Sequence, residues 1–184
     1  MPKPATLGRP SKSAKAVTKD KVHQVAFRLI NQSGLDALTF RALAKQLDVT
    51  PMAITHHVGT RKQLLVALIA FVFSDIGGAA KGATPKIRLR YLLNRYCERA
   101  IENSHLIPAM LADHSLISEG LSLFTDQIRN ELETFVDAET VTPILNLIID
   151  YTHGFVSAVA AAQENNGPNR KEYNTSIDWV LNQL

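Results

Sequence analysis

The sequence predicts an all-α fold of about nine helices and no sheet. Apolar residues recur with the 3.6-residue period of a helix along most of the chain, whereas the alternating pattern of strands is nearly absent. Threonine-proline pairs stand before three apolar stretches, and this pair favours a helix start because threonine caps the helix and proline needs no N–H at its first position. With 184 residues and 46% hydrophobic content, the chain can form one ordinary domain or two small ones.

The first segment predicts three short helices. A helix over residues 18–33 carries one apolar stripe and ends at Gly34, a typical C-terminal glycine. A second helix follows the candidate cap Thr39, and a third runs from Pro51 to Val58. Asp48 sits in the tight turn between them and accepts positive φ better than most residues. The residues expected to hold this helix-turn-helix together are Leu43, Ala44, Leu47, Val49 and Ile54.

The remaining helices are bounded by caps, prolines and glycines. Thr60 and Gln63 form a predicted capping box that opens a fourth helix through about Ile76, and Gly77, Gly78 and Gly82 then break the chain. The later elements are expected as a helix over 85–103, a short segment that Pro108 separates from a helix over 115–136, a long helix over 143–163, a loop over 165–169 and a final helix over 173–181.

Charge is divided unevenly along the chain. Residues 1–62 hold eleven lysine and arginine against three aspartate and no glutamate, a formal charge of +8, whereas residues 63–184 carry −5. Such a division favours an N-terminal surface that meets a polyanion, although a solvated basic tail without a partner has the same composition. The single cysteine, the lack of an apolar signal segment and the polar residues inside the apolar stretch 144–162 favour a cytoplasmic protein with no membrane span.

The third helix has side chains suited to reading a DNA groove. Met52, Thr55 and His56 face outward near its N-terminal half, with Thr50 at its start, and this half reaches base edges in a helix-turn-helix. Basic residues around the unit suit phosphate contacts, which fix the position without reading sequence. These are Arg41, Lys45, Arg61 and Lys62, together with the tail residues Lys3, Arg9, Lys12, Lys15, Lys19 and Lys21.

Residues from about Lys12 to Leu68 resemble the DNA-binding domain of the TetR family of transcriptional regulators. The resemblance is carried by the helix ending at Gly34, by LTFRALAKQLDVTPMAITHHV and by GTRKQLLVAL. It implies a homodimer on a palindromic operator, phosphate contacts by Thr39, Arg41 and Arg61, and a recognition helix lined by Thr50, Met52, Ala53, Thr55, His56 and His57. The chain departs from the family in having Thr55 where a tyrosine is usual and Asp48 where a glycine is usual.

The resemblance also implies a helical body that dimerises and often encloses a small-molecule site. In the sequence itself, residues 143–163 carry one formal charge, so a partner surface is expected to cover much of this helix, with Gly154, Ala158 and Ala162 allowing close approach. Ten residues combine apolar bulk with polar groups, as ligand sites do, although each is also an ordinary core residue. They are Tyr91, Asn94, Cys97, His105, Met110, His114, Phe124, Tyr151, His153 and Phe155, of which two or three are expected to line a cavity.

These features predict a DNA-binding transcriptional regulator, a repressor released from its operator by a small-molecule ligand. The alternative is a DNA-binding dimer with no effector. The expected parts are a basic arm over 1–17, the DNA-binding domain over 18–63 and the effector-binding and dimerisation domain over 64–184. No metal, cofactor or enzymatic activity is predicted, because His56 and His57 point about 100° apart on a helix and no phosphate loop or nucleophile motif is present.

Overall fold

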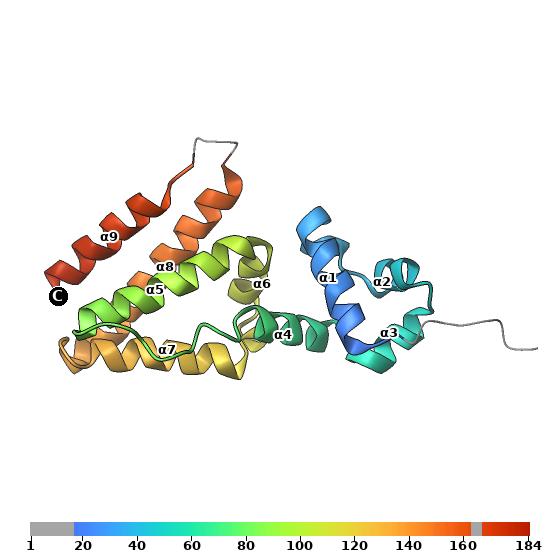
Figure 1. The fold of residues 1–184 in the computed structure, drawn as a ribbon, viewed down its shortest axis with the longest axis horizontal. Coiled ribbons are helices and arrows are strands. Elements are labelled where there is room, and N and C mark those ends of the chain that lie inside the picture. The colour runs from blue at the N-terminus through green and yellow to red at the C-terminus, as the bar shows by residue number, and fades with distance from the viewer. Residues whose placement is uncertain (1–16, 163–166) are drawn as a thin grey trace, which may run out of the picture. The chain divides into compact units, whose positions relative to one another are not determined.

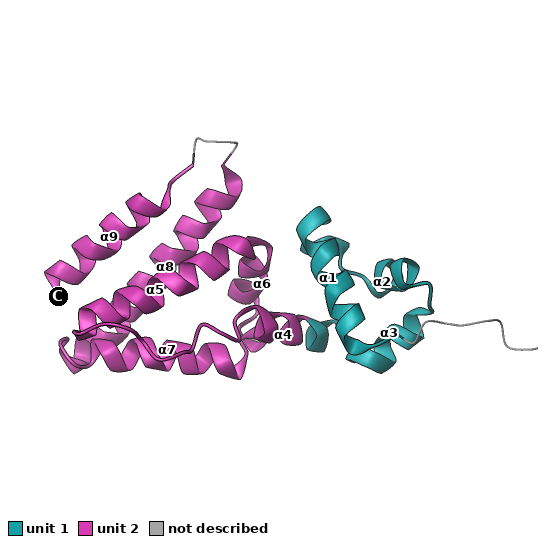
Figure 2. Cartoon of the chain, in the orientation of Figure 1, with its two compact units in different colours: residues 1–64 teal, residues 65–184 magenta. Residues whose placement is uncertain are grey.

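The computed structural model describes residues 17–162 and 167–184, so most of the predicted arm, including Lys12, lies outside the described residues. The chain divides into two compact units, residues 1–64 and residues 65–184 (Figure 2). Within the described ranges there are nine α-helices, three short 3₁₀ turns and no strand (Figure 1). The all-α prediction is confirmed.

The first unit is a three-helix domain built on α1, which spans Lys19–Ser33. A 3₁₀ turn, η1 (Leu35–Ala37), leads to α2 (Phe40–Leu47) and α3 (Pro51–Val58), and α2 and α3 pack on each other and on α1. The predicted stripe of α1 is buried, as are Leu43, Ala44 and Ile54, whereas Leu47 and Val49 are half-buried. The buried apolar residues of α1, α2 and α3 therefore hold the helix-turn-helix together.

The predicted caps are present in this unit. The hydroxyls of Thr39 and Thr50 each accept a hydrogen bond from the N–H three residues on, at 3.1 and 3.2 Å, and Thr18, which was not predicted as a cap, does the same at 3.3 Å. Thr60 and Gln63 form the expected reciprocal capping box at the start of the fourth helix. Asp48 has φ of 55° and ψ of 49°, so the turn takes the left-handed conformation expected of it.

The second unit is a helical body centred on α5 (Pro85–Glu102). Helix α4 (Arg61–Val72) begins in the first unit and continues into the body, where α7 (Glu119–Leu132), α8 (Ala138–Ala161) and α9 (Arg170–Gln183) all contact α5. A short helix α6 (Ile107–Ala112) lies between the 3₁₀ turns η2 (Ser104–Leu106) and η3 (His114–Leu116). The body core therefore forms where α5, α7, α8 and α9 meet.

Three predicted boundaries in the body are wrong. Helix α4 ends at Val72 rather than near Ile76, because the Ser74 hydroxyl and N–H both bond to the Phe71 carbonyl and close a tighter turn. Pro108 lies in the first turn of α6 and does not separate a segment from the next helix. A proline fits there because the N–H groups of the first turn have no partner within the helix. Helix α7 covers 119–132 rather than 115–136, since Ser118 caps it and residues 114–116 form η3.

The long helix was also misplaced at its start. Helix α8 begins at Ala138 and holds Pro143 inside it, so this threonine-proline pair is not a helix start. Burial of Val141 favours the extra turn, and the carbonyl that Pro143 leaves without a donor belongs to the exposed Glu139, where water can satisfy it. Helix α9 likewise starts earlier than expected, at Arg170, because Asn169 and Glu172 form a capping box.

Candidate nucleic-acid interface and body cavity

Helix α3 presents one exposed and one buried face. Ile54 and Val58 are buried against the domain, whereas Met52 is 76% exposed and Thr55 and His56 are also exposed. Ala53 and His57 are half-buried at the edges of the outward face. The residues expected to read DNA therefore lie on one side of a short helix that contains no acidic residue.

The polar groups of this face retain free hydrogen-bonding capacity. The Thr55 hydroxyl donates to the Pro51 carbonyl at 3.2 Å, which leaves its oxygen lone pairs available to a base donor. The rings of His56 and His57 lie edge to face with centroids 5.6 Å apart. The exposed set thus offers a methyl-bearing thioether, a hydroxyl acceptor and an imidazole, which suit contacts to base edges.

The residues expected to hold phosphate differ in how they are engaged. Arg41 is exposed on α2, and Thr39 is exposed while its hydroxyl caps that helix. The Arg61 guanidinium instead donates to the carbonyls of Leu38 and Leu35, both at 3.1 Å. Since a guanidinium has five N–H donors, Arg61 keeps donors for a phosphate while it ties the start of α4 to the turn before α2.

A separate cavity of about 320 Å³ lies in the body between α5, α6, η3, α7 and α8. Its deep wall is made of buried side chains, and exposed residues form its rim. The buried lining residues are Tyr96, Met110, Leu121, Phe124 and Leu145, and the exposed ones are Leu111, His114, Asn146 and Asp150. The shape is that of an apolar pocket with a polar mouth, typical of small-molecule sites.

Two polar groups meet at the deep wall of this cavity. The Tyr96 hydroxyl lies 2.6 Å from Nε2 of His153, and burial raises the pKa of Tyr96 far above its ordinary value. Burial also lowers the pKa of His153 against the opposing effect of the nearby Asp150 carboxylate, so the imidazole is neutral at neutral pH. Nδ1 of His153 is buried without a hydrogen-bond partner among the described residues.

The structure brings some of the predicted pocket residues together and separates others. Met110, His114, Phe124 and His153 all line the cavity. Tyr96 was missed, because its place within an apolar helical stripe made it look like core. The other six do not line it. Tyr91 lies beside Lys81 and Arg95, and Asn94 is hydrogen-bonded to Arg90 and Arg170. Cys97 is buried and His105 is exposed, while the rings of Tyr151 and Phe155 both pack on Tyr173.

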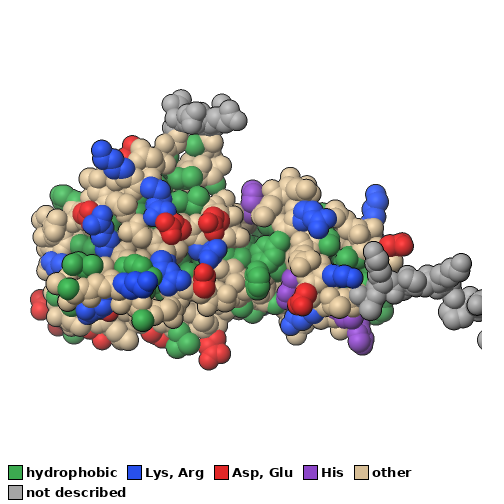
Figure 3. Space-filling model, viewed as in Figure 1, with side chains coloured by type: hydrophobic (Ala, Val, Ile, Leu, Met, Phe, Trp, Pro, Cys, Tyr) green, Lys and Arg blue, Asp and Glu red, His purple; other side chains and the backbone are tan. Residues whose placement is uncertain are grey.

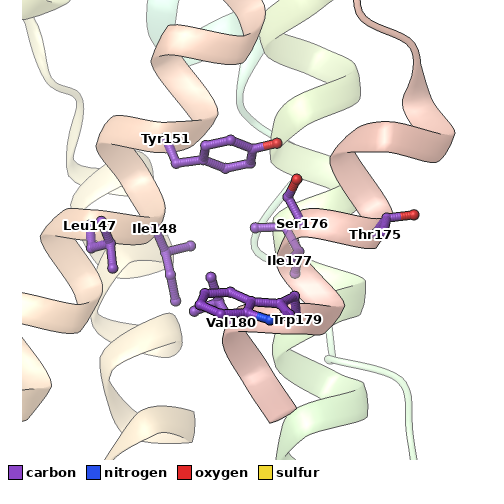
Figure 4. A pocket seen from close by; sticks show the side chains of 8 residues that line it. All are labelled: Leu147, Ile148, Tyr151, Thr175, Ser176, Ile177, Trp179 and Val180. Carbon is purple, nitrogen blue, oxygen red and sulfur yellow. The ribbon is translucent and has the colours of Figure 1, made fainter. Parts of the chain in front are cut away.

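Helices α8 and α9 form an open apolar groove of about 430 Å³ (Figure 4). Tyr151 and Leu147 border it from α8, and Trp179 and Val180 border it from α9. Trp179 is 65% exposed and Leu147 is 57% exposed, an unusual state for such large apolar side chains in a lone chain. By contrast, charges of both signs are interspersed over the face of the body seen in Figure 3.

Helix α8 is also the one described helix that is long and apolar enough to span a membrane by length and composition. Only 28% of its most apolar window is buried within the chain. Its buried side contacts α5, α7 and α9, as a core helix does, and its exposed side borders the groove. The hydropathy of α8 is therefore accounted for by packing on one side and an apolar surface on the other.

Comparison with known proteins matches residues 23–68 to the family of bacterial regulatory proteins of the tetR type. The matched residues include α2, α3 and the first turns of α4, where the interface residues lie. Comparison with curated protein sequences gives no match.

Solved structures share the fold over nearly the whole chain. BioQ of Mycobacterium smegmatis is 18% identical with a TM-score of 0.75, covering 91% of this chain and 97% of that one. A structure of BioQ with its natural double-stranded DNA operator is 19% identical with a TM-score of 0.73, covering 91% and 98%. ActR of Streptomyces coelicolor, in complex with actinorhodin, is 13% identical with a TM-score of 0.71, covering 91% and 96%. At these identities the likeness establishes the fold.

Proposed function

We propose that this chain, whose residues 23–68 match the tetR family of bacterial regulatory proteins, is a homodimeric repressor released from a palindromic operator by a small-molecule ligand. Its role is transcriptional regulation, not catalysis. The proposal gives residues 18–63 the DNA contacts and residues 64–184 the ligand and the dimer contacts, with residues 1–17 as a basic arm along the DNA backbone.

The exposed face of α3 carries this proposal. Met52, Thr55 and His56 project from a helix whose opposite side is buried, within a domain that matches the family over these residues. The helix lies where a recognition helix lies in a helix-turn-helix, so its outward side chains are the ones that reach base edges. Thr39, Arg41 and Arg61 then hold phosphates on either side.

Two features of the body support the rest of the proposal. The apolar groove between α8 and α9 supplies a surface that a second copy would cover, which places two recognition helices on one duplex. The cavity beside Tyr96 supplies the space for a small molecule. The neighbours point the same way, since BioQ is seen with an operator and ActR with actinorhodin. We place this regulator in the cytoplasm, where its DNA lies.

Selection of bound duplexes from a random pool tests the proposed function. We expect enrichment of a palindrome with half-sites about one helical turn apart, because a two-fold dimer presents two equivalent helices. Affinity for this duplex should fall steeply as salt rises. If the full chain shows no preference for any duplex over bulk competitor, the proposal is wrong.

Arg41→Gln separates backbone contacts from base reading. Removing one phosphate contact should weaken binding to specific and unrelated duplexes alike, and should reduce the slope of log affinity against log salt by about 1. Lys171→Gln is the matched control, since it removes one exposed positive charge from α9 in the other unit. Equal salt slopes for Arg41→Gln and the wild type, measured by fluorescence anisotropy, would contradict the assignment.

A further inference from the structure

We infer that Met52 is an oxidation site, at which a hydroperoxide converts the thioether to a sulfoxide and thereby lowers the affinity of α3 for its operator. The inference rests on the proposed function in one respect, that α3 reads DNA. It adds a chemical modification that regulates this reading and the class of oxidant that produces it.

The sulfur of Met52 is open to a small oxidant. Of the exposed large apolar side chains in the described ranges, Met52 is the most exposed, at 76%. It lies in the first turn of α3, directly after Pro51, on the side of the helix that faces away from the buried Ile54. A peroxide can therefore reach this thioether without any movement of the fold, at the position proposed to contact a base edge.

The other sulfur atoms of the described residues are shielded. The sequence has three methionines and one cysteine. Met110 is 5% exposed and Cys97 is fully buried. Burial also raises the pKa of the Cys97 thiol to about 11, so the thiolate, which is the form that a peroxide oxidises, is scarce near neutral pH. Met52 is therefore the one exposed sulfur within residues 17–162 and 167–184.

The reaction needs only this side chain and the oxidant. The sulfur lone pair attacks the outer oxygen of a hydroperoxide, ROOH, so that the O–O bond breaks as the S–O bond forms. The proton of the attacked hydroxyl passes to the departing oxygen, which leaves as ROH. The sulfur is oxidised, the peroxide is reduced to an alcohol or water, and the side chain becomes methionine sulfoxide.

Oxidation changes what Met52 offers to a base edge. The thioether is apolar and a weak acceptor, whereas the sulfoxide is polar and carries an acceptor oxygen. In the major groove, guanine, adenine and thymine present acceptors, and only adenine and cytosine present donors. The added oxygen therefore meets acceptors more often than donors. Because His56 lies four residues later on the same side of α3, the change also affects the neighbouring contact.

Mass spectrometry of the full-length protein after treatment with hydrogen peroxide tests the site itself. We expect the peptide that contains Met52 to gain one oxygen atom before the peptides that contain Met110 and Cys97, because only Met52 is exposed. In protein unfolded by urea, Met52 and Met110 should react at similar rates. Oxidation of Met110 or Cys97 before Met52 in the folded protein would overturn the inference.

The affinity for a duplex obtained by selection gives the functional readout. After peroxide treatment, the dissociation constant of the wild type should rise by about tenfold or more, as expected for the loss of one good base contact. Methionine sulfoxide reductases A and B together should restore the affinity, since each enzyme reduces one epimer of the sulfoxide. Recovery with dithiothreitol alone would assign the effect to a cysteine and would overturn the inference.

Three variants assign the response to one sulfur. Met52→Leu removes the sulfur and keeps an apolar side chain of similar volume. Measured on a duplex selected with this variant itself, its affinity should not change on peroxide treatment. Met110→Leu and Cys97→Ala remove the two buried sulfurs and should respond to peroxide as the wild type does. A Met52→Leu protein that still loses affinity would overturn the inference.

The proposed function and this inference give distinguishable failures. If the untreated protein prefers no duplex over bulk competitor, the proposed function is wrong and the inference falls with it. If the untreated protein binds its selected duplex, and oxidation of Met52 leaves that affinity unchanged, the proposed function stands and the inference alone is wrong.

Discussion

Asp48 turns the chain between α2 and α3 with a backbone conformation that few residues adopt. Its φ of 55° lies in the left-handed region, where the Cβ atom of an L-residue costs roughly 1–2 kcal/mol, although less for aspartate than for most residues. The N–H groups of Asp48 and Val49 both bond to the Ala44 carbonyl, which closes α2. The backbone strain at Asp48 therefore lowers the stability of the turn that orients α3.

Replacing Asp48 measures this strain. We expect Asp48→Gly to raise the free energy of unfolding of the first unit by up to about 1 kcal/mol, because glycine reaches positive φ without a Cβ penalty. Asp48→Ala should lower it by about 1 kcal/mol. Both variants remove the carboxylate, so their difference isolates the backbone. Amide hydrogen exchange of α1 and α2 measures the change, and equal protection in the two variants would contradict the explanation.

The protonation of His153, which lines the body cavity, makes the stability of the body depend on pH. Burial lowers its folded-state pKa below the ordinary value of about 6.5, while Asp150 opposes the shift. Tyr96 of α5, Arg129 of α7 and His114 of η3 also border the cavity. Because the unfolded chain binds this proton first as pH falls, the stability that neutral His153 contributes is present above about pH 6.5 and is lost as pH falls through its folded-state pKa.

His153→Gln should therefore flatten the pH dependence of stability below pH 6.5, since glutamine does not titrate. Urea denaturation at several pH values between about 5 and 8 measures this, and the midpoint of the wild type should fall more steeply than that of the variant. His23, whose pKa burial also lowers, is expected to keep part of the slope in both proteins. His105→Gln, at an exposed site, should behave as the wild type. Equal slopes for the wild type and His153→Gln would contradict the prediction.

At the scale of elements, the Arg61 side chain ties the start of α4 to the turn before α2. Arg61 bonds to two carbonyls around η1, those of Leu35 and Leu38, and Leu38 is fully buried. The capping box of Thr60 and Gln63 orders the same turn. Arg61 thus has a structural role beside the proposed phosphate contact, and these two roles can be separated.

Arg61→Gln should lower the stability of the first unit by about 1.5–3 kcal/mol, the range of hydrogen bonds from a charged donor. Arg41→Gln is the matched control, because Arg41 is exposed and its loss should reduce DNA affinity with little change in stability. Hydrogen exchange of the α1–α3 amides gives the stability, and anisotropy gives the affinity. Unchanged exchange in Arg61→Gln would show that the carbonyl contacts contribute nothing.

At the scale of the whole molecule, the body leaves an apolar groove between α8 and α9 uncovered among the described residues. Trp179 and Leu147 stand exposed on α9 and α8, and the groove between these helices is lined almost wholly by apolar atoms (Figure 4). A buried tryptophan at the centre of an interface typically accounts for a large part of its affinity. The proposed dimer therefore depends on this surface.

Trp179→Glu should dissociate the dimer, raising its dissociation constant by about 30-fold or more, because a central aromatic contact is worth at least about 2 kcal/mol. Leu123→Glu alters another exposed large apolar residue, 62% exposed on α7, and should leave the dimer intact. Sedimentation equilibrium distinguishes the two. A Trp179→Glu protein with the wild-type dissociation constant would place the interface elsewhere.

The sequence by itself determined the features that depend on local chemistry. Thr39 and Thr50 cap their helices, Asp48 takes positive φ, and the stripe of α1 is buried, because capping, backbone sterics and helical periodicity act over a few neighbouring residues. The same residues predicted the helix-turn-helix and carry the match to the tetR family model over residues 23–68. These features need no knowledge of what packs against them.

Only the tertiary structure decided where distant residues meet. Pro143 lies inside α8 because burial of Val141 outweighs the proline's preference for a helix start, and no local pattern records that balance. Tyr96 and His153 are 57 residues apart, and only the packing of α5 on α8 brings them to 2.6 Å. Periodicity shows that a residue is buried but not which residue it is buried against, and for this reason the cavity could not be predicted from the sequence.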